Sequence, residues 1–263
     1  MRTGIDRHCG FTLTELAIVV AIVALLVGGT LLTLSAQNSA REINDTRRTL
    51  EMARDAIMGF AVANGRLPCP AVPSSSGTEK LGGIPGTCAS YEGFVPAVTL
   101  GIGPTGKRPG TPEPGYLLDA WLMPIRYHVT NAGSLTSATN PICPATATTN
   151  VFTTAGGMKS VGLGCLAPDL NICNSSIGAS PTLCAAGQLQ SISPAVVYST
   201  GKNFATALAV GADEQANVDN NAVFVAHEPL PAGTSDPRGE FDDIVIWISP
   251  YVLYNRLISA GAI

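Results

Sequence analysis

The stretch Cys9-Gly10-Phe11-Thr12-Leu13-Thr14-Glu15-Leu16-Ala17-Ile18 decides how this chain is organised. A short polar leader ends at Gly10, and an apolar run then extends from Phe11 to Leu34 with Glu15 as its only charged residue. As a helix rising ~1.5 Å per residue, this run would span about 36 Å, which is enough to cross a bilayer. A carboxylate near the end of such a helix is costly in hydrocarbon unless it is paired, so Glu15 is predicted to be functional.

These residues resemble the prepilin signal of type IV pilins and of the pseudopilins of type II secretion systems. The resemblance implies that a prepilin peptidase cuts between Gly10 and Phe11 and methylates the new N-terminal Phe11. It also implies that Glu15 pairs with the N-terminal amine of a neighbouring subunit, because a buried carboxylate and a buried ammonium can neutralise one another. The implied partners are the peptidase, other pilin or pseudopilin subunits, and an inner-membrane assembly platform with an ATPase.

Two other kinds of N-terminal segment explain these residues less well. A secretory signal peptide would have a shorter uncharged core and small residues before its cleavage site, but Leu34-Ser35-Ala36 places a leucine there. A generic single-span anchor accounts for neither Gly10-Phe11 nor Glu15. Positive charge at Arg2 and Arg7 precedes the run, so the leader is expected in the cytoplasm and the C-terminal domain in the periplasm, or outside the cell in a pilus.

The sequence predicts four segments: a leader at residues 1–10, a transmembrane helix at 11–34, its amphipathic continuation at 35–64, and an exported globular domain at 65–263. The continuation is predicted from apolar residues at helical spacing, namely Ile43, Leu50, Ala53, Ile57 and Phe60. The sequence Asn64-Gly65, followed by Pro68 and Pro70, is expected to end this helix.

The exported domain shows short strand signals separated by long loops. Residues 67–115 are rich in Pro, Gly and Ser and are expected to connect the helix to a sheet, and residues 131–193 form a loop-heavy insertion with short strands. Strands are predicted at 116–118, 124–129, 195–198, 222–226 and 244–248, and a terminal helix at 251–259. The expected fold is α+β and pilin-like, with the long helix packed on an antiparallel sheet.

One segment adds to the family resemblance. Residues 119–124 read Asp-Ala-Trp-Leu-Met-Pro and are similar to the Asp-Pro-Trp-Gly-x-Pro segment that begins the sheet in major pseudopilins of type II secretion. The chain departs from that pattern at Ala120 and at Leu122.

Six of the seven cysteines lie in the exported domain, while Cys9 would leave with the leader. An even number in an oxidising compartment predicts three disulfides and a domain whose loops are cross-linked. Six cysteines allow fifteen pairings. Neighbour pairing is only a default: Cys69 with Cys88, Cys143 with Cys165, and Cys173 with Cys184. Zinc binding is the alternative, but no Cys-x-x-Cys spacing supports it.

The resemblance to major pseudopilins extends to an acidic region near the C-terminus, which in that family binds calcium. Calcium prefers six to eight oxygen ligands, and this region supplies the candidates Asp213, Asp219, Asp242 and Asp243. The order of ligands does not match that family residue by residue. A solvated polar loop is the alternative, and no other cofactor is expected.

Other functional classes find little support. Residues 101–107 satisfy two glycine-rich nucleotide patterns, but the prolines that follow prevent a phosphate-binding helix from starting there. His128 and His227 have no G-x-S-x-G serine to act with, so no enzyme is expected. The formal net charge of −4 and the lack of a basic stripe speak against nucleic-acid binding.

The sequence therefore predicts a membrane-anchored, pilin-like subunit that works by assembly, and its length and cysteine-rich insertion favour a minor or tip-proximal subunit. A type IV pilus and a type II secretion pseudopilus are not separated by these residues. The alternative is a single-span envelope protein of the inner membrane with a periplasmic ligand-binding domain and no filament role.

Overall fold

The structure is a computed structural model that describes residues 12–103, 105–106, 115–204 and 211–263, except for the side chains of residues 27–36. The chain divides into two units, Met1–Asn44 and Asp45–Ile263.

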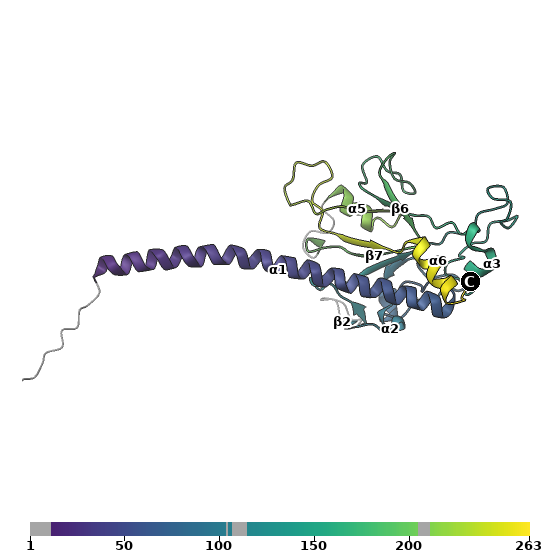
Figure 1. The fold of residues 1–263 in the computed structure, drawn as a ribbon, viewed down its shortest axis with the longest axis horizontal. Helices are drawn as coiled ribbons and strands as arrows, with labels where there is room; N and C mark the ends of the chain where they lie inside the picture. Colours follow the sequence, from purple (N-terminus) through teal and green to yellow (C-terminus); the bar gives the residue numbers. More distant parts are fainter. Residues whose placement is uncertain (1–11, 104, 107–114, 205–210) are drawn as a thin grey trace, which may run out of the picture. The chain divides into compact units, whose positions relative to one another are not determined.

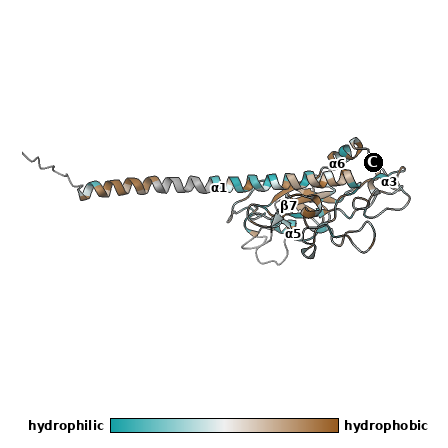
Figure 2. Cartoon of the chain, turned by 90° about the horizontal axis from the view of Figure 1, so that it is seen from below, coloured by the Kyte–Doolittle hydropathy of each residue, from teal (hydrophilic) through white to brown (hydrophobic). Residues whose placement is uncertain are grey.

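The long helix α1 comprises Leu13–Asn64, 52 residues. It ends where the sequence predicts, because Gly65 adopts a left-handed φ of 64° and its N–H donates to Ala61 O at 2.8 Å. Figure 2 colours the first turns of α1 brown for apolar residues and shows teal polar residues farther along. Within the described part of the chain, no helix has a stretch both long and apolar enough to be a membrane span. The membrane span expected at 11–34 is thus not confirmed. Residue 11 and the side chains of residues 27–34, which belong to that expected span, lie outside the described part of the chain.

The second unit is built on a four-stranded antiparallel sheet with strand order β1-β4-β7-β9. Its strands are β1 (Glu92–Phe94), β4 (Arg126–Val129), β7 (Ala195–Ser199) and β9 (Ile244–Trp247). In register, Tyr127 lies between Gly93 and Val197, and Val197 in turn pairs with Ile246. The antiparallel sheet predicted from the sequence is confirmed, with β1 as a member found in the expected connecting region.

Alternation along these strands gives the sheet two apolar faces. Tyr127, Val129 and Val197 belong to one core together with a row of buried α1 residues: Leu50, Ala53, Ile57, Met58 and Ala61. The predicted amphipathic helix therefore packs on the sheet. Phe60, which was expected in this stripe, lies only partly buried beside the Arg66 guanidinium, 5.0 Å from its ring centre.

The opposite face of the sheet packs on a second, three-stranded sheet. Val196 and Tyr198 share a core with Leu170, Ile172 and Phe224. The second sheet has the order β6-β5-β8, with β6 (Leu189–Ser193), β5 (Leu170–Cys173) and β8 (Val223–Val225). β5 runs antiparallel to β6 but parallel to β8. The parallel pair was not predicted, because it joins strands far apart in the sequence.

The shorter elements lie in the segments between these strands. They are η1 (Pro73–Ser75), α2 (Ala97–Leu100), β2 (Thr105–Gly106), β3 (Tyr116–Leu117), α3 (Gly157–Val161), η2 (Leu163–Cys165) and α5 (Ala212–Val218). The terminal helix α6 (Pro250–Ser259) confirms its prediction and buries Leu253 and Leu257 in the same core as α1. Figure 1 shows α6, in yellow, beside the blue C-terminal turns of α1.

Three disulfides cross-link the second unit: Cys69–Cys88, Cys143–Cys165 and Cys173–Cys184. Each joins neighbours in the sequence, which is the default pairing. The first contributes to the α1 core, the second closes a loop of the 131–193 insertion, and the third ties β5 to the loop that precedes β6. The expected loop-rich region held by disulfides is confirmed.

The turn at residues 119–124 is organised by the buried carboxylate of Asp119. Its Oδ1 accepts hydrogen bonds from Trp121 N and Met123 N at 2.9 and 2.8 Å, and its Oδ2 accepts one from Ser199 Oγ at 2.6 Å. Leu122 within this turn has a φ of 64°. The position that departs from the glycine of the pseudopilin segment thus has a backbone conformation that favours glycine.

Candidate functional site

The first described turn of α1 positions Glu15 through a reciprocal contact with Thr12. Glu15 Oε2 accepts hydrogen bonds from Thr12 N and Thr12 Oγ1, both at 2.9 Å, and Glu15 N donates to Thr12 Oγ1 at 3.2 Å. This is a capping box, in which a threonine at the N-cap and a glutamate three residues later satisfy the free N–H groups of a helix start. Glu15 therefore has a local structural role in addition to the one predicted. Gly10 and Phe11 lie outside the described residues.

The apolar side chains that follow Glu15 are uncovered in the first unit. Leu16 is 59 % exposed, Ile22 54 % and Leu25 80 %, and the same holds for Leu13, Ile18, Val19, Val20, Val23 and Leu26. A contiguous apolar surface of this kind marks a site for other proteins or for lipid. The structure thus presents the N-terminal half of α1 as an interaction surface.

In the second unit, the structure gathers three carboxylates from the predicted acidic region. Oxygens of Glu214, Asp242 and Asp243 lie within 4.8 Å of one another. Glu214 comes from α5, and the two aspartates immediately precede β9. Asp243 Oδ2 accepts a hydrogen bond from Asn217 Nδ2 at 2.7 Å, and Glu214 Oε1 accepts one from Asp242 N at 3.0 Å.

Burial and mutual repulsion disfavour the ionised forms in this cluster. Burial, with the charge of Glu214 as a further cause, raises the pKa of Asp242 to about 6. Burial and the neighbouring charges of Glu214 and Asp242 raise the pKa of Asp243 well above its ordinary value. Asp242 Oδ1 is buried without a hydrogen-bond partner. An unsatisfied oxygen among crowded carboxylates is chemically suited to a hard cation.

The glycine at 201 permits the approach of Asp242. Gly201 has a φ of 66°, and a Cβ there would lie 1.7 Å from Asp242 Oδ1. The backbone N–H groups of the next two residues, Lys202 and Asn203, donate to Asp242 Oδ2 at 3.0 Å each. Residues 201–203 thus help to hold the carboxylate of Asp242, which lies far later in the sequence.

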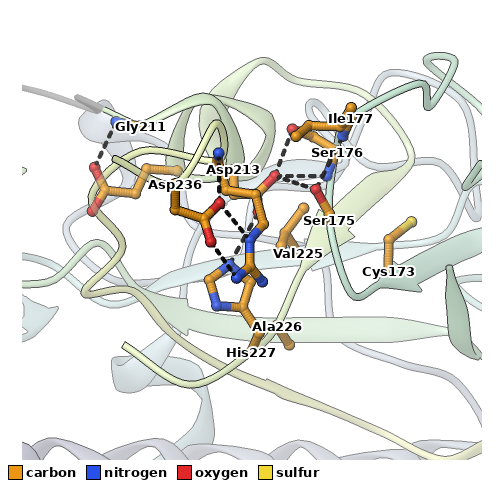
Figure 3. A network of polar contacts seen from close by, with 12 residues as sticks. Cys173, Ser175, Ser176, Ile177, Gly211, Asp213, Val225, Ala226, His227 and Asp236 are labelled. Carbon is orange, nitrogen blue, oxygen red and sulfur yellow. Dashed lines mark hydrogen bonds and ion pairs between the residues drawn. The ribbon is translucent and has the colours of Figure 1, made fainter. Parts of the chain in front are cut away.

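Asp213, a predicted calcium ligand, belongs to a different network (Figure 3). Its Oδ1 accepts hydrogen bonds from Ser176 N and Ser176 Oγ at 2.6 and 2.7 Å and from Ser175 Oγ at 3.2 Å, and its Oδ2 lies 3.0 Å from His227 Nε2. Burial would raise the pKa of Asp213, but these hydrogen bonds outweigh it and lower the pKa. Asp213 therefore ties α5 to the loop after β5 and does not join the carboxylate cluster.

This network places an aspartate, a histidine and two serines together without making a hydrolytic triad. Among the described contacts, Ser175 and Ser176 bond to Asp213 and not to His227, whereas a triad needs a serine hydroxyl on the histidine. The other ring nitrogen of His227, Nδ1, lies 2.6 Å from the carbonyl oxygen of Glu228. Both ring nitrogens thus face acceptors, so both hydrogen bonds form together only on a doubly protonated ring.

Asp219, the remaining predicted ligand, follows α5 and contacts Asn221, whose Nδ2 lies 2.6 Å from Asp219 Oδ2. The four predicted ligands are therefore not brought together, and Glu214 was missed. A sequence signal for Glu214 exists, because it stands three residues after Gly211, which is the spacing of a helix-capping pair. In the structure, Glu214 is the third residue of α5 and its Oε2 accepts a hydrogen bond from Gly211 N at 3.3 Å. No helix was predicted at residues 212–218, where α5 lies.

The other candidates behave as the sequence suggests. In the glycine-rich stretch, α2 ends before Gly101, and no helix begins within its described residues, 101–103 and 105–106. His128 lies on β4, in contact with the ring of Phe224 at 5.3 Å.

Comparison with known proteins gives one match. The family described as the prokaryotic N-terminal methylation motif matches residues 5–31, which covers the N-terminal segment alone. No curated protein and no solved structure matches the chain. The matched segment contains Gly10, Phe11 and Glu15. The chain thus carries the prepilin-type N-terminal signal of type IV pilins and pseudopilins.

Proposed function

We propose that this chain is a minor pilin or pseudopilin, a structural subunit that is processed at Gly10 and assembled into a type IV pilus or a type II secretion pseudopilus. The observation that carries the proposal is the methylation motif at residues 5–31, within which the described helical turns expose their apolar side chains. Such a helix gains stability only when lipid or other helices cover it. The motif supports a structural subunit over an enzyme.

In this proposal, the apolar N-terminal segment resides in the inner membrane before assembly, and the cross-linked domain lies in the periplasm. The partners are the prepilin peptidase, other pilin or pseudopilin subunits, and an assembly platform with its ATPase. Three disulfides in the second unit agree with an oxidising compartment. Assembly would move the N-terminal segment from lipid into a core of like helices, with Glu15 neutralising a neighbour's N-terminal amine.

Processing is the direct test. Co-expression of the full chain with a prepilin peptidase is expected to give a product that begins at methylated Phe11, as measured by mass spectrometry. Gly10→Val should abolish cleavage because a branched side chain at the cut site would clash with a peptidase that accepts glycine. Gly4→Val, in the same leader, is the matched control and should be cleaved normally. An intact Met1 terminus, or a cut near Ala36, would instead support a single-span envelope protein.

We also propose that the cluster of Glu214, Asp242 and Asp243 binds calcium. The three carboxylates would supply the charge, and the buried Asp242 Oδ1 lacks another partner. Asn203, whose backbone N–H donates to Asp242 Oδ2, also carries an amide oxygen of the kind that calcium accepts. A bound cation would relieve the repulsion that raises the pKa values of Asp242 and Asp243.

A further inference from the structure

A polar cleft of about 520 Å³ opens in the second unit, beside the layer where its two sheets pack. Glu92 of β1 and His128 of β4, which are register partners, line one side. Asp169, just before β5, and Asn220 and Asn221, just before β8, line another. Tyr91, Asn131, Leu170, Pro181, Thr182 and Ala222 complete the lining. None of the lining residues belongs to the methylation motif or to the carboxylate cluster.

His128 is the feature that distinguishes this cleft from an ordinary surface hollow. Its side chain is only 9 % exposed, and its ring is oriented by an edge-to-face contact with Phe224. Burial lowers the pKa of His128 to about 4, so the ring is neutral at neutral pH. Neither ring nitrogen has a hydrogen-bond partner among the described residues, although a neutral imidazole offers one donor and one acceptor. These nitrogens are not among the described side-chain atoms that are fully buried without a partner, so they are open to the cleft and a ligand there can hydrogen-bond them.

The charge around the cleft is negative. Two carboxylates, Glu92 and Asp169, line it, and no lysine or arginine is among the described lining residues. Burial raises the pKa of Glu92, and the nearby charge of Asp219 raises it further, while Arg126 at 3.3 Å opposes the shift. Of the two lining carboxylates, Arg126 forms an ion pair with Glu92. Among the described residues, Asp169 accepts a hydrogen bond from Thr130 Oγ1 and forms no ion pair. A cation in the cleft would therefore be attracted most by Asp169, with Glu92 as a further acceptor.

A single metal ion does not fit this arrangement. Among the described residues, only Glu214, Asp242 and Asp243 bring three ligand atoms of this type within 4.8 Å of one another. Glu92, His128 and Asp169 are therefore spread too widely to coordinate one ion. A larger cation with several N–H donors can reach groups that stand apart. Guanidinium and ammonium groups have this chemistry and no acceptor of their own.

We propose that the cleft between β1, β4 and the loops before β5 and β8 binds a ligand that carries a guanidinium or ammonium group. The carboxylates of Glu92 and Asp169 accept its N–H groups, the amide oxygen of Asn131 or Asn220 accepts another, and the ring of His128 hydrogen-bonds the rest of the ligand. The cation is either a small free molecule or a basic side chain on another polypeptide, since both offer the same charged group.

The test uses the full mature chain in detergent micelles and ligand-observed NMR with Nα-acetyl-L-argininamide, called argininamide below, as the probe. Nα-acetyl-citrullinamide is the matched ligand control, because a neutral urea replaces the guanidinium at nearly the same shape and the blocked α-amine carries no charge in either ligand. Argininamide is expected to bind at least about tenfold more tightly, in line with the greater strength of charged hydrogen bonds. Equal binding of the two ligands, or no binding of argininamide at millimolar concentration, would overturn the proposal.

Four variants locate the site. Glu92→Gln and Asp169→Asn should each weaken argininamide binding about fivefold to tenfold, since each removes one charged acceptor at nearly constant shape. Thr182→Lys keeps both carboxylates but places a tethered ammonium at the rim, and it should compete with the probe. Glu51→Gln removes an exposed carboxylate of α1 and should change nothing. Thermal melting of each variant separates a lost site from a lost fold. Retention of full affinity by the first three variants would refute the assignment.

A second arm distinguishes the two sources of the cation. A blocked Gly-Gly-Arg-Gly-Gly peptide is titrated beside argininamide on the same protein. Tighter binding of the peptide identifies a side chain of another polypeptide as the natural occupant, and tighter binding of argininamide identifies a small free cation. Both results support cation binding, whereas failure of both ligands contradicts it.

Discussion

Apolar side chains of the same kind differ in solvent exposure between the two ends of α1. In the first unit, Ile22 is 54 % exposed, while in the second unit Ile57 is completely buried against the sheet. The described N-terminal turns, residues 13–26, carry apolar side chains around most of the helix. The C-terminal turns are apolar along one stripe, and the domain of the same chain covers it. The second half of α1 thus folds with its domain, whereas the described apolar turns of the first half stay exposed in the single chain; in the proposed function, lipid or other subunits cover them.

The largest effect on assembly is expected at Glu15. Two substitutions there separate its helix-capping role from its proposed pairing with a neighbour's N-terminal amine. Glu15→Leu should abolish most incorporation into sheared filaments or cross-linked pseudopilus complexes, because both the capping box and the charge are lost. Glu15→Gln keeps a side chain that can cap the helix but removes the charge, and it should fail similarly if pairing with a neighbour's amine is what matters. Cleavage by the peptidase should persist in both variants.

The Glu15 measurement compares the filament fraction of each tagged variant with its inner-membrane level. Normal incorporation of Glu15→Gln beside failure of Glu15→Leu would assign the residue to helix capping alone. Normal incorporation of both variants would remove Glu15 from assembly altogether.

A matched pair of isoleucine substitutions tests the comparison between the two ends of α1. Ile57→Ala should lower the free energy of unfolding of the domain by ~2–5 kcal/mol, because it leaves a cavity in the core shared with Tyr127 and Val197. Ile22→Ala should change that quantity by less than ~0.5 kcal/mol, since its side chain is exposed in the single chain. Denaturant unfolding followed by near-UV circular dichroism measures both. Similar losses from the two substitutions would break the comparison.

The carboxylate cluster should make domain stability depend on pH in the absence of calcium. The pKa of Asp242 is raised to about 6 in the folded chain from an unfolded value of 3.8. The folded state therefore binds more protons at Asp242 between these values, so the stability that Asp242 contributes is fully present below pH 4 and is lost as the pH rises through 6. At pH 7, Asp242→Asn should be more stable than wild type by ~1–2 kcal/mol, and the difference should vanish near pH 4.

Calcium provides the second readout for the same variant. Millimolar calcium should raise the melting temperature of wild type and leave that of Asp242→Asn unchanged, because binding to the native state stabilises it. Asp55→Asn removes an exposed carboxylate of α1 and serves as the control. A calcium response that survives in Asp242→Asn would place the ion elsewhere, and no response in wild type would contradict calcium binding.

The smallest effect is expected at Leu122, on the domain side of the comparison. Its φ of 64° is unfavourable for a residue with a Cβ, and its side chain is 55 % exposed, so little packing is lost on truncation. Leu122→Gly should stabilise the domain by ~0.5–1 kcal/mol, which is the left-handed strain released less the added flexibility of glycine in the unfolded chain. Thermal unfolding measures the shift, and Leu183→Gly, at another exposed leucine, should not stabilise. A destabilised Leu122→Gly would show that the leucine contributes more by packing than its backbone costs.

Much of the architecture was predictable because it rests on local signals. The end of α1 at Asn64 follows from Gly65, and β7, β9 and α6 follow from apolar runs and from Pro250. The misses came where neighbours in space decide. β1 lies in a stretch without strand periodicity and forms because its backbone pairs with β4. α5 lies in a polar segment whose helical form is tied by Asp213 to Ser176 and by Asn217 to Val225.

The sequence by itself determined the N-terminal signal, the length and end of α1, and the cross-linked character of the domain. These depend on residue types at fixed short spacing, so they need no knowledge of distant contacts. Only the tertiary structure decided which carboxylates meet: it joined Glu214 to Asp242 and Asp243 and separated Asp213 from them. It also placed His128, Glu92 and Asp169 around one cleft. These contacts depend on how strands far apart in the sequence pair with one another, and that pairing cannot be read from composition or from local residue spacing.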